Sequence, residues 1–273
     1  MVIDSHYLCH RAFHSTRNLE WRGRATGVIF GFLRDISYLQ NEFPHSQLVF
    51  CFEGQTLKRR ELLPSYKSRR KAPSCVEEKR AYLALKQQIA DLRCQLLKRV
   101  GFRNIFCEEG YESDDLLAQV ALQASPEQEV ILVTGDYDLF QCLRHNVSIY
   151  LPQKQRVLTK SWFETKYGIH PTEWALVKAI AGCTGDNVPG VRGVGEKTAL
   201  KFVKRDLPSA SKAFQSILCP EGKSTVRRNR LLVQLPFSGC PFLKFQPDQL
   251  CKRAWFEMTS GLGMRSIAHQ SPI

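Results

Sequence analysis

The sequence predicts an α/β protein with a mostly parallel central sheet and helices on both faces of that sheet. Short apolar runs of strand length alternate with segments whose apolar residues recur at helical spacing, and this alternation is typical of parallel sheets. Acidic residues directly follow several of the apolar runs. Because open α/β sheets place their sites at the carboxyl ends of strands, we expect the function at that edge.

The predicted elements follow one another in a regular order. The predicted strands are Met1–Ile3, Leu48–Phe52, Ile105–Phe106 and Glu129–Val133, with a further strand or hairpin at Val147–Leu151 and Arg156–Leu158. The predicted helices are Ser5–His14, Arg24–Gln40, Lys79–Val100, an acidic helix from Ser113 to about Ala124, Pro171–Ala181 and one that begins at Glu196.

Three carboxylates crowd the start of one predicted helix, at Glu112, Asp114 and Asp115. Ser113 is a plausible N-cap and acids are common in first helical turns, so ordinary capping explains this stretch when it is taken by itself. More acids follow the predicted strands, namely Asp4, Glu53, Asp136 and Asp138. Convergence of so many carboxylates favours a hard divalent cation as their counter-charge, Mg²⁺ or Mn²⁺, because these metals prefer oxygen ligands.

The composition indicates a nucleic-acid partner. The chain of 273 residues carries 39 Lys and Arg against 26 Asp and Glu, which gives a net charge of +13. Lys58 to Lys71 is dense in basic residues and contains Tyr66, an aromatic able to stack on a base. A solvated loop is the alternative interpretation of this run, and the net charge favours the strand-gripping one.

A turn-rich stretch separates two predicted helices in the last third of the chain. Cys183 to Gly195 is rich in glycine and contains Pro189-Gly190, and the next helix begins with Glu196-Lys197. Glycines before a helix let backbone N–H groups approach a phosphate closely, and Lys197 and Lys201 add charge. The pattern predicts a helix-hairpin-helix that grips duplex backbone without reading sequence.

These motifs together resemble the 5′ nuclease superfamily, which includes the N-terminal nuclease domain of bacterial DNA polymerase I and stand-alone phage flap endonucleases. The resemblance runs from Val2 to about Val203, with weaker likeness near Arg228–Phe237. Its motifs are Ile3-Asp4 with Arg11-Ala12-Phe13-His14, Tyr66-Lys67 with Arg70, Gly110 to Asp115, Thr134 to Asp138, and Asp186 to Val191 with Gly193 to Ala199. It implies a two-metal phosphodiesterase that cuts 5′ flaps or removes nucleotides from a 5′ end.

The resemblance also implies a role for each matching residue. Lys67 and Arg70 would lie on a helical arch near residues 56–75 and contact the scissile phosphate. The metal ligands would be Asp4, Glu53, Glu112, Asp114, Asp115, Asp136, Asp138 and Asp186. The DNA contacts would come from Arg11, Arg59, Tyr66, Arg192, Gly193, Gly195, Lys197 and Lys201. Two Mg²⁺ or Mn²⁺ ions are expected, with a monovalent cation, K⁺, at the hairpin.

Two positions depart from the family pattern. Glu53 stands where aspartate is usual, which keeps the charge and lengthens the side chain. Cys183 stands where another aspartate is usual, which removes an oxygen ligand from the second metal site. An alternative function is therefore a relative that binds branched DNA and cuts it weakly. A small ribonuclease of the related PIN-like class is a third hypothesis, disfavoured by the hairpin and the basic run.

We expect a nuclease core at residues 1–165, and a helix-hairpin-helix region at 166–273 whose tail packs on that core. The expected partner is DNA with 5′ flaps, nicks or 5′ ends, bound by a monomer, and the sequence leaves open whether RNA–DNA primers are substrates. Ten cysteines without a Cys-x-x-Cys pair predict free thiols in a reducing compartment. No stretch has the length of a membrane span, and we expect the cytoplasm of a bacterium or of a phage-infected host.

Overall fold

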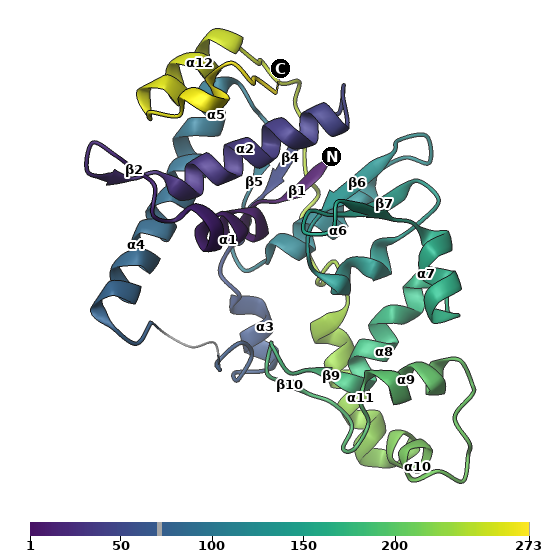
Figure 1. Ribbon diagram of the computed structural model, residues 1–273. Coiled ribbons are helices and arrows are strands. Elements are labelled where there is room, and N and C mark those ends of the chain that lie inside the picture. Colours follow the sequence, from purple (N-terminus) through teal and green to yellow (C-terminus); the bar gives the residue numbers. More distant parts are fainter. Residues whose placement is uncertain (70–72, 273) are drawn as a thin grey trace. The chain divides into compact units, whose positions relative to one another are not determined.

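The computed structural model describes residues 1–69 and 73–272 (Figure 1). The predicted catalytic residue Arg70 lies outside these described residues. Two compact units are present: Met1–Glu53, Lys71–Cys107 and Leu243–Ile273 form the first, and Gly54–Arg70 and Glu108–Phe242 form the second. Each unit draws on separate stretches of chain, and the domain boundary at residue 165 stays a prediction. Among the described residues, every helix is too short or too polar to cross a lipid bilayer.

The first unit is built on three parallel strands, β1 (Val2–Asp4), β4 (Val49–Cys51) and β5 (Ile105–Phe106). β4 lies in the middle and pairs with both neighbours, with Asp4 opposite Cys51 and Phe50 opposite Ile105. All residues of β1 and β4 are buried, as their apolar sequences predict. The carboxyl ends of β1 and β4 therefore lie at the same edge of this part of the sheet.

Helices α1 (Ser5–Thr16) and α2 (Gly27–Glu42) pack closely against each other in the first unit (Figure 1). A Cβ atom on Gly31 would lie 2.6 Å from Ala12 Cβ, so only glycine allows this approach. The predicted helix at Arg24–Gln40 begins later than expected. Arg24–Ala25 (β3) instead pairs with Glu20–Trp21 (β2) in a short antiparallel hairpin.

The predicted helix at Lys79–Val100 is interrupted. α4 (Val76–Asp91) passes into a π-helical turn, η1 (Leu92–Leu96), and then into α5 (Leu97–Val100). The C-terminal segment returns to this place, where Gln249 N donates to Gly101 O and Cys251 N donates to Val100 O. α12 (Lys252–Gly261) and α13 (Arg265–Ala268) follow and complete the first unit.

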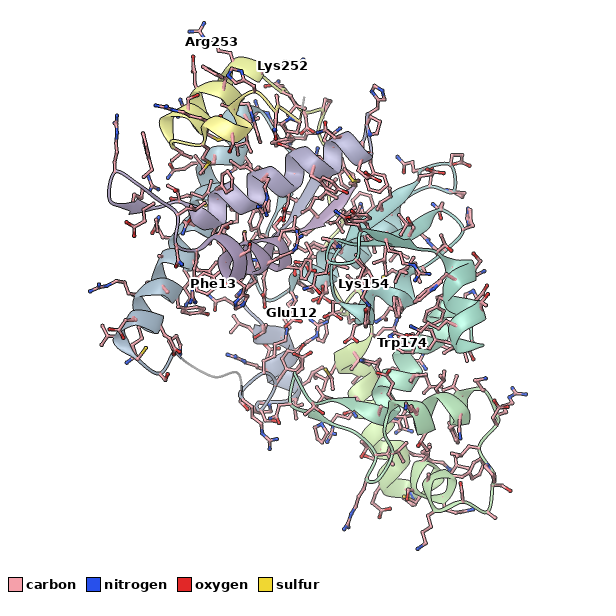
Figure 2. The ribbon with its side chains drawn as sticks, viewed as in Figure 1. Phe13, Glu112, Lys154, Trp174, Lys252 and Arg253 are labelled. Carbon is pink, nitrogen blue, oxygen red and sulfur yellow. The ribbon has the colours of Figure 1, made fainter. Side chains whose placement is uncertain are left out.

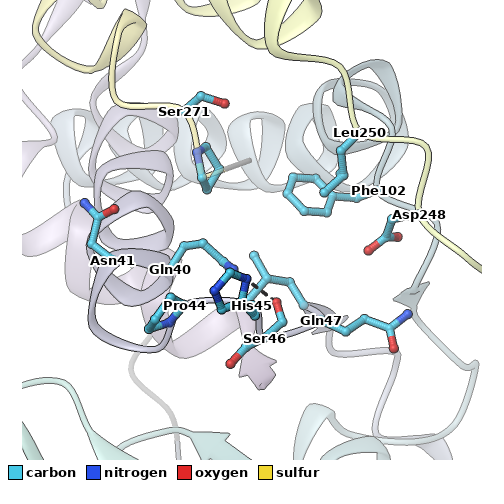
Figure 3. Close-up of a pocket in the computed structure, with 12 residues that line it drawn as sticks. Gln40, Asn41, Pro44, His45, Ser46, Gln47, Phe102, Asp248, Leu250 and Ser271 are labelled. Atoms are coloured by element: carbon cyan, nitrogen blue, oxygen red, sulfur yellow. Dashed lines mark hydrogen bonds between the residues drawn. The ribbon is translucent and has the colours of Figure 1, made fainter.

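A pocket of about 520 Å³ opens in the first unit where the C-terminal segment passes the end of α2 (Figure 3). Its lining combines apolar and polar side chains and includes one carboxylate, that of Asp248. Asp248 Oδ1 accepts hydrogen bonds from Arg103 N and Asn104 Nδ2, so this oxygen already has partners. A lining with one carboxylate does not provide a metal site of the predicted kind.

The second unit contains a mixed set of strands. β6 (Val130–Val133) and β7 (Val147–Leu151) are parallel, and β8 (Arg156–Leu158) is antiparallel to β7. α6 (Ser113–Gln123) precedes β6, and the 3-10 helix η2 (Tyr137–Cys142) follows it. α7 (Lys160–Tyr167) and the 3-10 turn η3 (Pro171–Glu173) come next. The predicted α/β class with mostly parallel pairing is thus confirmed.

The remaining helices of the second unit surround a short hairpin. α8 (Trp174–Ala181) leads into β9 (Gly182–Cys183) and β10 (Val188–Pro189), and α9 (Glu196–Val203) follows after a turn. α10 (Lys212–Leu218) and α11 (Pro220–Val233) complete the unit, and α11 packs along α8 (Figure 1). In the described part of the basic run, up to residue 69, α3 (Leu57–Leu62) is the only helix, and turns follow it.

Candidate active site

The acidic start of α6 is a capping box. Glu112, labelled in Figure 2, is the N-cap, and its backbone N–H donates to Asp115 Oδ2 at 3.0 Å. The Glu112 side chain in turn accepts from the backbone N–H of Asp115. Capping therefore accounts for the spacing of these two acids. Asp114, between them, is half-buried in the first turn.

Asp115 is paired with Arg59 in the interior of the second unit. Arg59 Nη1 lies 2.5 Å from Asp115 Oδ2, and Nη2 lies 2.7 Å from Oδ1. Asp115 is 0% exposed and Arg59 is 2% exposed. Phe237 N also donates to Asp115 Oδ1, and Arg59 Nε donates to Leu232 O. Burial alone would lower the pKa of Arg59, but its bonds to Asp115 raise that pKa above its ordinary value.

This pair bears on two predictions from the sequence. Arg59 was expected to contact DNA, yet its guanidinium is buried and bound to Asp115 and Leu232. Asp115 was expected to bind metal. Both of its oxygens accept hydrogen bonds from Arg59, and metal binding by Asp115 stays a prediction. The pair joins α3 to α6 and is a structural element of the second unit.

Lys67 forms a second ion pair, with Glu112. Its Nζ lies 2.6 Å from Glu112 Oε1 and 3.9 Å from Asp186 Oδ1, and its backbone N–H donates to Asp186 O. Tyr66 OH donates to Glu112 Oε2 at 3.1 Å. Tyr66 is 3% exposed, and its stacking on a base stays a prediction. Burial and the nearby Glu112 raise the pKa of Tyr66, which keeps its hydroxyl protonated as a donor.

A group of possible metal ligands lies beside this pair. One ligand atom from each of Asp138, Cys183 and Asp186 falls within 4.8 Å of the others. η2, β9 and the turn before β10 supply these residues. Cys183 Sγ donates to Asp186 Oδ2 at 3.5 Å. Burial, with the charges of Asp186 and Asp138, raises the pKa of the Cys183 thiol to about 11, so the thiol is neutral near pH 7.

Lys178 on α8 was not anticipated from the sequence. Its Nζ lies 2.9 Å from Asp138 Oδ1 and 3.5 Å from Glu196 Oε2. Burial would lower the pKa of Lys178, but Asp138 outweighs burial and raises it. The sequence did contain a signal for this role, because Lys178 is the single charged residue in an otherwise apolar helix that leads into the hairpin.

Asp136 caps η2, and its Oδ1 accepts a hydrogen bond from Asp138 N at 2.7 Å.

Asp4 and Glu53 belong to the first unit, where Asp4 is the last residue of β1 and Glu53 comes after β4. Asp4 is buried and caps α1, accepting from Tyr7 N at 3.0 Å. Glu53 N donates to His6 Nδ1 at 2.8 Å. Burial, together with His10 and Arg93, lowers the pKa of His6 to about 4, so His6 is a neutral acceptor. Arg11 is paired with Asp35 at 2.6 Å, which uses part of its donor capacity within the first unit.

The turn before α9 exposes its backbone. Gly193 has a φ of +75°, and a Cβ atom on Gly193 or Gly195 would meet nothing within 4 Å. Gly195 is the N-cap of α9. The predicted DNA-contact residues of this region are all exposed: Arg192, Gly193, Gly195, Lys197 and Lys201. Their placement leaves them accessible, and their contact with DNA stays a prediction.

Residues 1–168 match the family described as 5′-3′ exonuclease, N-terminal resolvase-like domain. The chain belongs to the 5′-3′ exonuclease family. Thermostable DNA polymerase I of Thermus thermophilus is 33% identical over 207 residues, which cover 75% of this chain and 24% of the polymerase. The chain thus spans about a quarter of the length of these polymerase relatives. The 5′-3′ exonuclease of Bacillus subtilis is 32% identical over 234 residues, which cover 82% of this chain and 75% of that protein.

Solved structures share the fold of this 5′-3′ exonuclease family member. A flap endonuclease of bacteriophage T5, in a pseudo-enzyme–product complex with DNA and metal ions, matches with a TM-score of 0.73 and 22% identity. The match covers 98% of both chains. The T5 5′-exonuclease with bound zinc matches with a TM-score of 0.73 and 21% identity. Identity at this level establishes the common fold.

Proposed function

We propose that this chain is a divalent-metal-dependent 5′ nuclease that cuts DNA at 5′ flaps and removes nucleotides from 5′ ends. The observation that carries the proposal is the group Asp138, Cys183 and Asp186, with Lys67 bound next to it. Family membership supports it, since relatives include an enzyme named 5′-3′ exonuclease. The resemblance in fold to a T5 flap endonuclease solved with DNA and metal ions adds further support.

The donor set fits a hard divalent ion. Asp138 and Asp186 supply carboxylate oxygens, and Mg²⁺ often binds through one or two carboxylates while keeping several water ligands. A bound ion of this type would supply an activated water and stabilise a leaving oxygen. Lys67 contributes a fixed positive charge beside Glu112 and Asp186, suited to a phosphate oxygen on which charge develops.

The proposal includes several further features. A second ion, held with help from Glu112 or Asp114, stays part of it. We also propose that the native metal is Mg²⁺ or Mn²⁺ and that K⁺ binds at the hairpin turn. The protein would act as a monomer in the cytoplasm of a bacterium or phage-infected host. RNA–DNA primers are an open substrate class that the same cleavage assay can include.

Cleavage of a labelled 5′-flap DNA tests the function. We expect cutting near the junction with Mg²⁺ and loss of cutting with EDTA. Asp186→Asn should abolish cutting, because it removes ligand charge and keeps shape. Asp206→Asn is the matched control, since Asp206 pairs with Lys204 away from the group. Equal cutting with and without EDTA, or full activity of Asp186→Asn, would contradict the metal assignment.

A second candidate function, branched-DNA binding with weak cleavage, is favoured by Cys183. Its neutral thiol is a poor ligand for Mg²⁺ and adds no negative charge to the site. The same assay separates the two functions. Tight flap binding without cleavage at any Mg²⁺ or Mn²⁺ concentration would favour the binding relative.

Restoring a carboxylate at position 183 is expected to tighten metal binding. Cys183→Asp should lower the Mg²⁺ concentration for half-maximal cleavage by roughly tenfold, which is a typical change in metal affinity when a residue around a metal ion is replaced. Mn²⁺ should support the native chain better than Mg²⁺, because Mn²⁺ binds protein sites more tightly. The measurement is a metal titration of the cleavage rate. Cys183→Ser, which has similar size and no charge, should leave the curve in place. Coincident curves for the native chain and Cys183→Asp would show that residue 183 does not face the metal.

A further inference from the structure

We propose that α11 carries a second contact surface for duplex DNA backbone, formed by Lys223, Arg227 and Arg230. We call these three residues the basic stripe. The proposal rests on the DNA-directed function above, and it adds a surface outside the hairpin. Its basis is the geometry of the helix, the absence of carboxylate partners and the attachment of α11 to the hairpin.

The spacing places the three cations along one line of the helix. Residues four and three positions apart share a face, and at about 1.5 Å per residue the stripe extends roughly 10 Å along the axis. The opposite face is the buried one and contains Gly222, Asn229, Leu232 and Val233. All three members of the stripe are exposed. α11 therefore presents its charges outward while its other face packs on α8.

Among the residues that the structure describes, the basic stripe forms no ion pair with a carboxylate. Within the described residues, no Asp or Glu oxygen lies within 4.0 Å of its charged nitrogens, unlike Arg253 on α12, which pairs with Glu257. The surrounding segment from Leu207 to Val233 has a single acid, Glu221, and carries the basic residues Lys212, Lys223, Arg227, Arg228 and Arg230. Like charges at this spacing repel one another, so an external polyanion would relieve the repulsion.

Buried polar contacts attach α11 to the start of the hairpin turn. Asn229 is 0% exposed, and its Nδ2 donates to Ala179 O and to Pro189 O, at 2.9 Å each. Arg228 Nη2 donates to Pro189 O at 3.3 Å. These bonds join α11, which carries the basic stripe, to Pro189 of β10 within the second unit. A duplex presents about one charge per 1.7 Å of axis, so backbone beside the hairpin offers phosphates to both surfaces.

The salt dependence of binding tests the proposal. Equilibrium binding of a labelled flap duplex is measured in EDTA, which prevents metal-dependent cleavage. For Lys223→Gln/Arg227→Gln/Arg230→Gln, the slope of log K against log salt should fall in magnitude by roughly 2 to 3, at about 0.9 per phosphate contact. Lys197→Ala should remove about one contact, and its effect should add to that of the triple variant.

A charge-matched triple variant in the first unit is the control. Lys244→Gln/Lys252→Gln/Arg265→Gln removes the same charge from other exposed positions, of which Lys252 is labelled in Figure 2. This control variant should leave the slope of log K against log salt unchanged. An unchanged slope for the stripe variant, or equal losses in the two triple variants, would overturn the proposal. Arg227→Gln alone, with an expected loss of about one contact, serves if the triple variant is unstable.

The salt dependence of binding tests the basic stripe, whereas cleavage tests the nuclease proposal. If the slope falls as expected while no metal supports cleavage, the stripe stands and the nuclease proposal fails. If cleavage is present and the slope does not fall, the nuclease proposal stands and the stripe is overturned.

Discussion

Arg59→Ala is expected to lower the free energy of unfolding of the second unit by roughly 3–5 kcal/mol, the usual cost of removing one partner of a buried ion pair. The variant would leave the Asp115 carboxylate at 0% exposure without its two bonds to the guanidinium. Leu232 O would also lose its bond from Arg59 Nε. Both losses lie between α3, α6 and the end of α11, so the segments that carry Lys67 and Glu112 would loosen together.

Urea unfolding measures this effect, and two variants make the result specific. Arg60→Ala changes the neighbouring arginine, which is exposed, and should shift stability by less than about 0.5 kcal/mol. Arg59→Met/Asp115→Leu removes both charges and should be more stable than Arg59→Ala, because no uncompensated charge is left buried. The structural interpretation would be wrong if Arg59→Ala cost no more than Arg60→Ala.

This pair changes how activity data on Asp115 should be interpreted. The family resemblance alone would predict that Asp115→Asn stops cleavage by removing a metal ligand. In the structure the same substitution places an amide against the Arg59 guanidinium and removes the charge that balances it. Loss of cleavage in Asp115→Asn is therefore evidence about the metal only if the variant is as stable as the native chain.

The strands and the acids after them were accessible from the sequence because both depend on local pattern. Val130–Val133 is a run of apolar residues with strand propensity, and such a run has few alternatives to a buried strand. Asp4 and Glu53 follow strands of this type, and the parallel register of β1 and β4 places both at one edge. The capping of α6 was only partly visible. The acidic first turn is a local signal, but Ser113, the expected N-cap, lies inside α6 and Glu112 is the N-cap.

The roles of the basic residues could not be read from the sequence. Arg59 lies in a dense basic run, and only a partner 56 positions away in the chain makes it a buried residue. Tyr66 is likewise committed to Glu112, 46 positions away. The contact of the C-terminal segment with Gly101 also depends on distant residues. Propensity and periodicity report local preference and carry no information about such pairings.

Lys67→Ala is expected to lower the single-turnover cleavage rate by roughly 10²- to 10³-fold, the scale for loss of one electrostatic stabiliser of a transition state. Lys67 is held from two sides: its backbone N–H donates to Asp186 O, and its Nζ lies 2.6 Å from Glu112 Oε1. Its side chain is 9% exposed, so the ammonium is fixed beside the acids and is not part of a mobile surface. A fixed charge of this kind acts on the chemical step more than on binding.

The measurement pairs single-turnover rates at saturating flap DNA with equilibrium binding in EDTA. Arg60→Ala, in the same basic run and exposed, should affect the rate little and serves as the control. If Lys67→Ala weakens binding and leaves the rate unchanged, Lys67 is an anchor for DNA with no part in the reaction.

The cleavage rate of Lys67→Ala at high Mg²⁺ distinguishes two roles for the Lys67 ammonium. Lys67 serves only as a counter-charge to Glu112 if high Mg²⁺ restores the rate, because a divalent cation can replace it in that role. A rate that stays low at saturating Mg²⁺ requires the ammonium itself at the reacting phosphate.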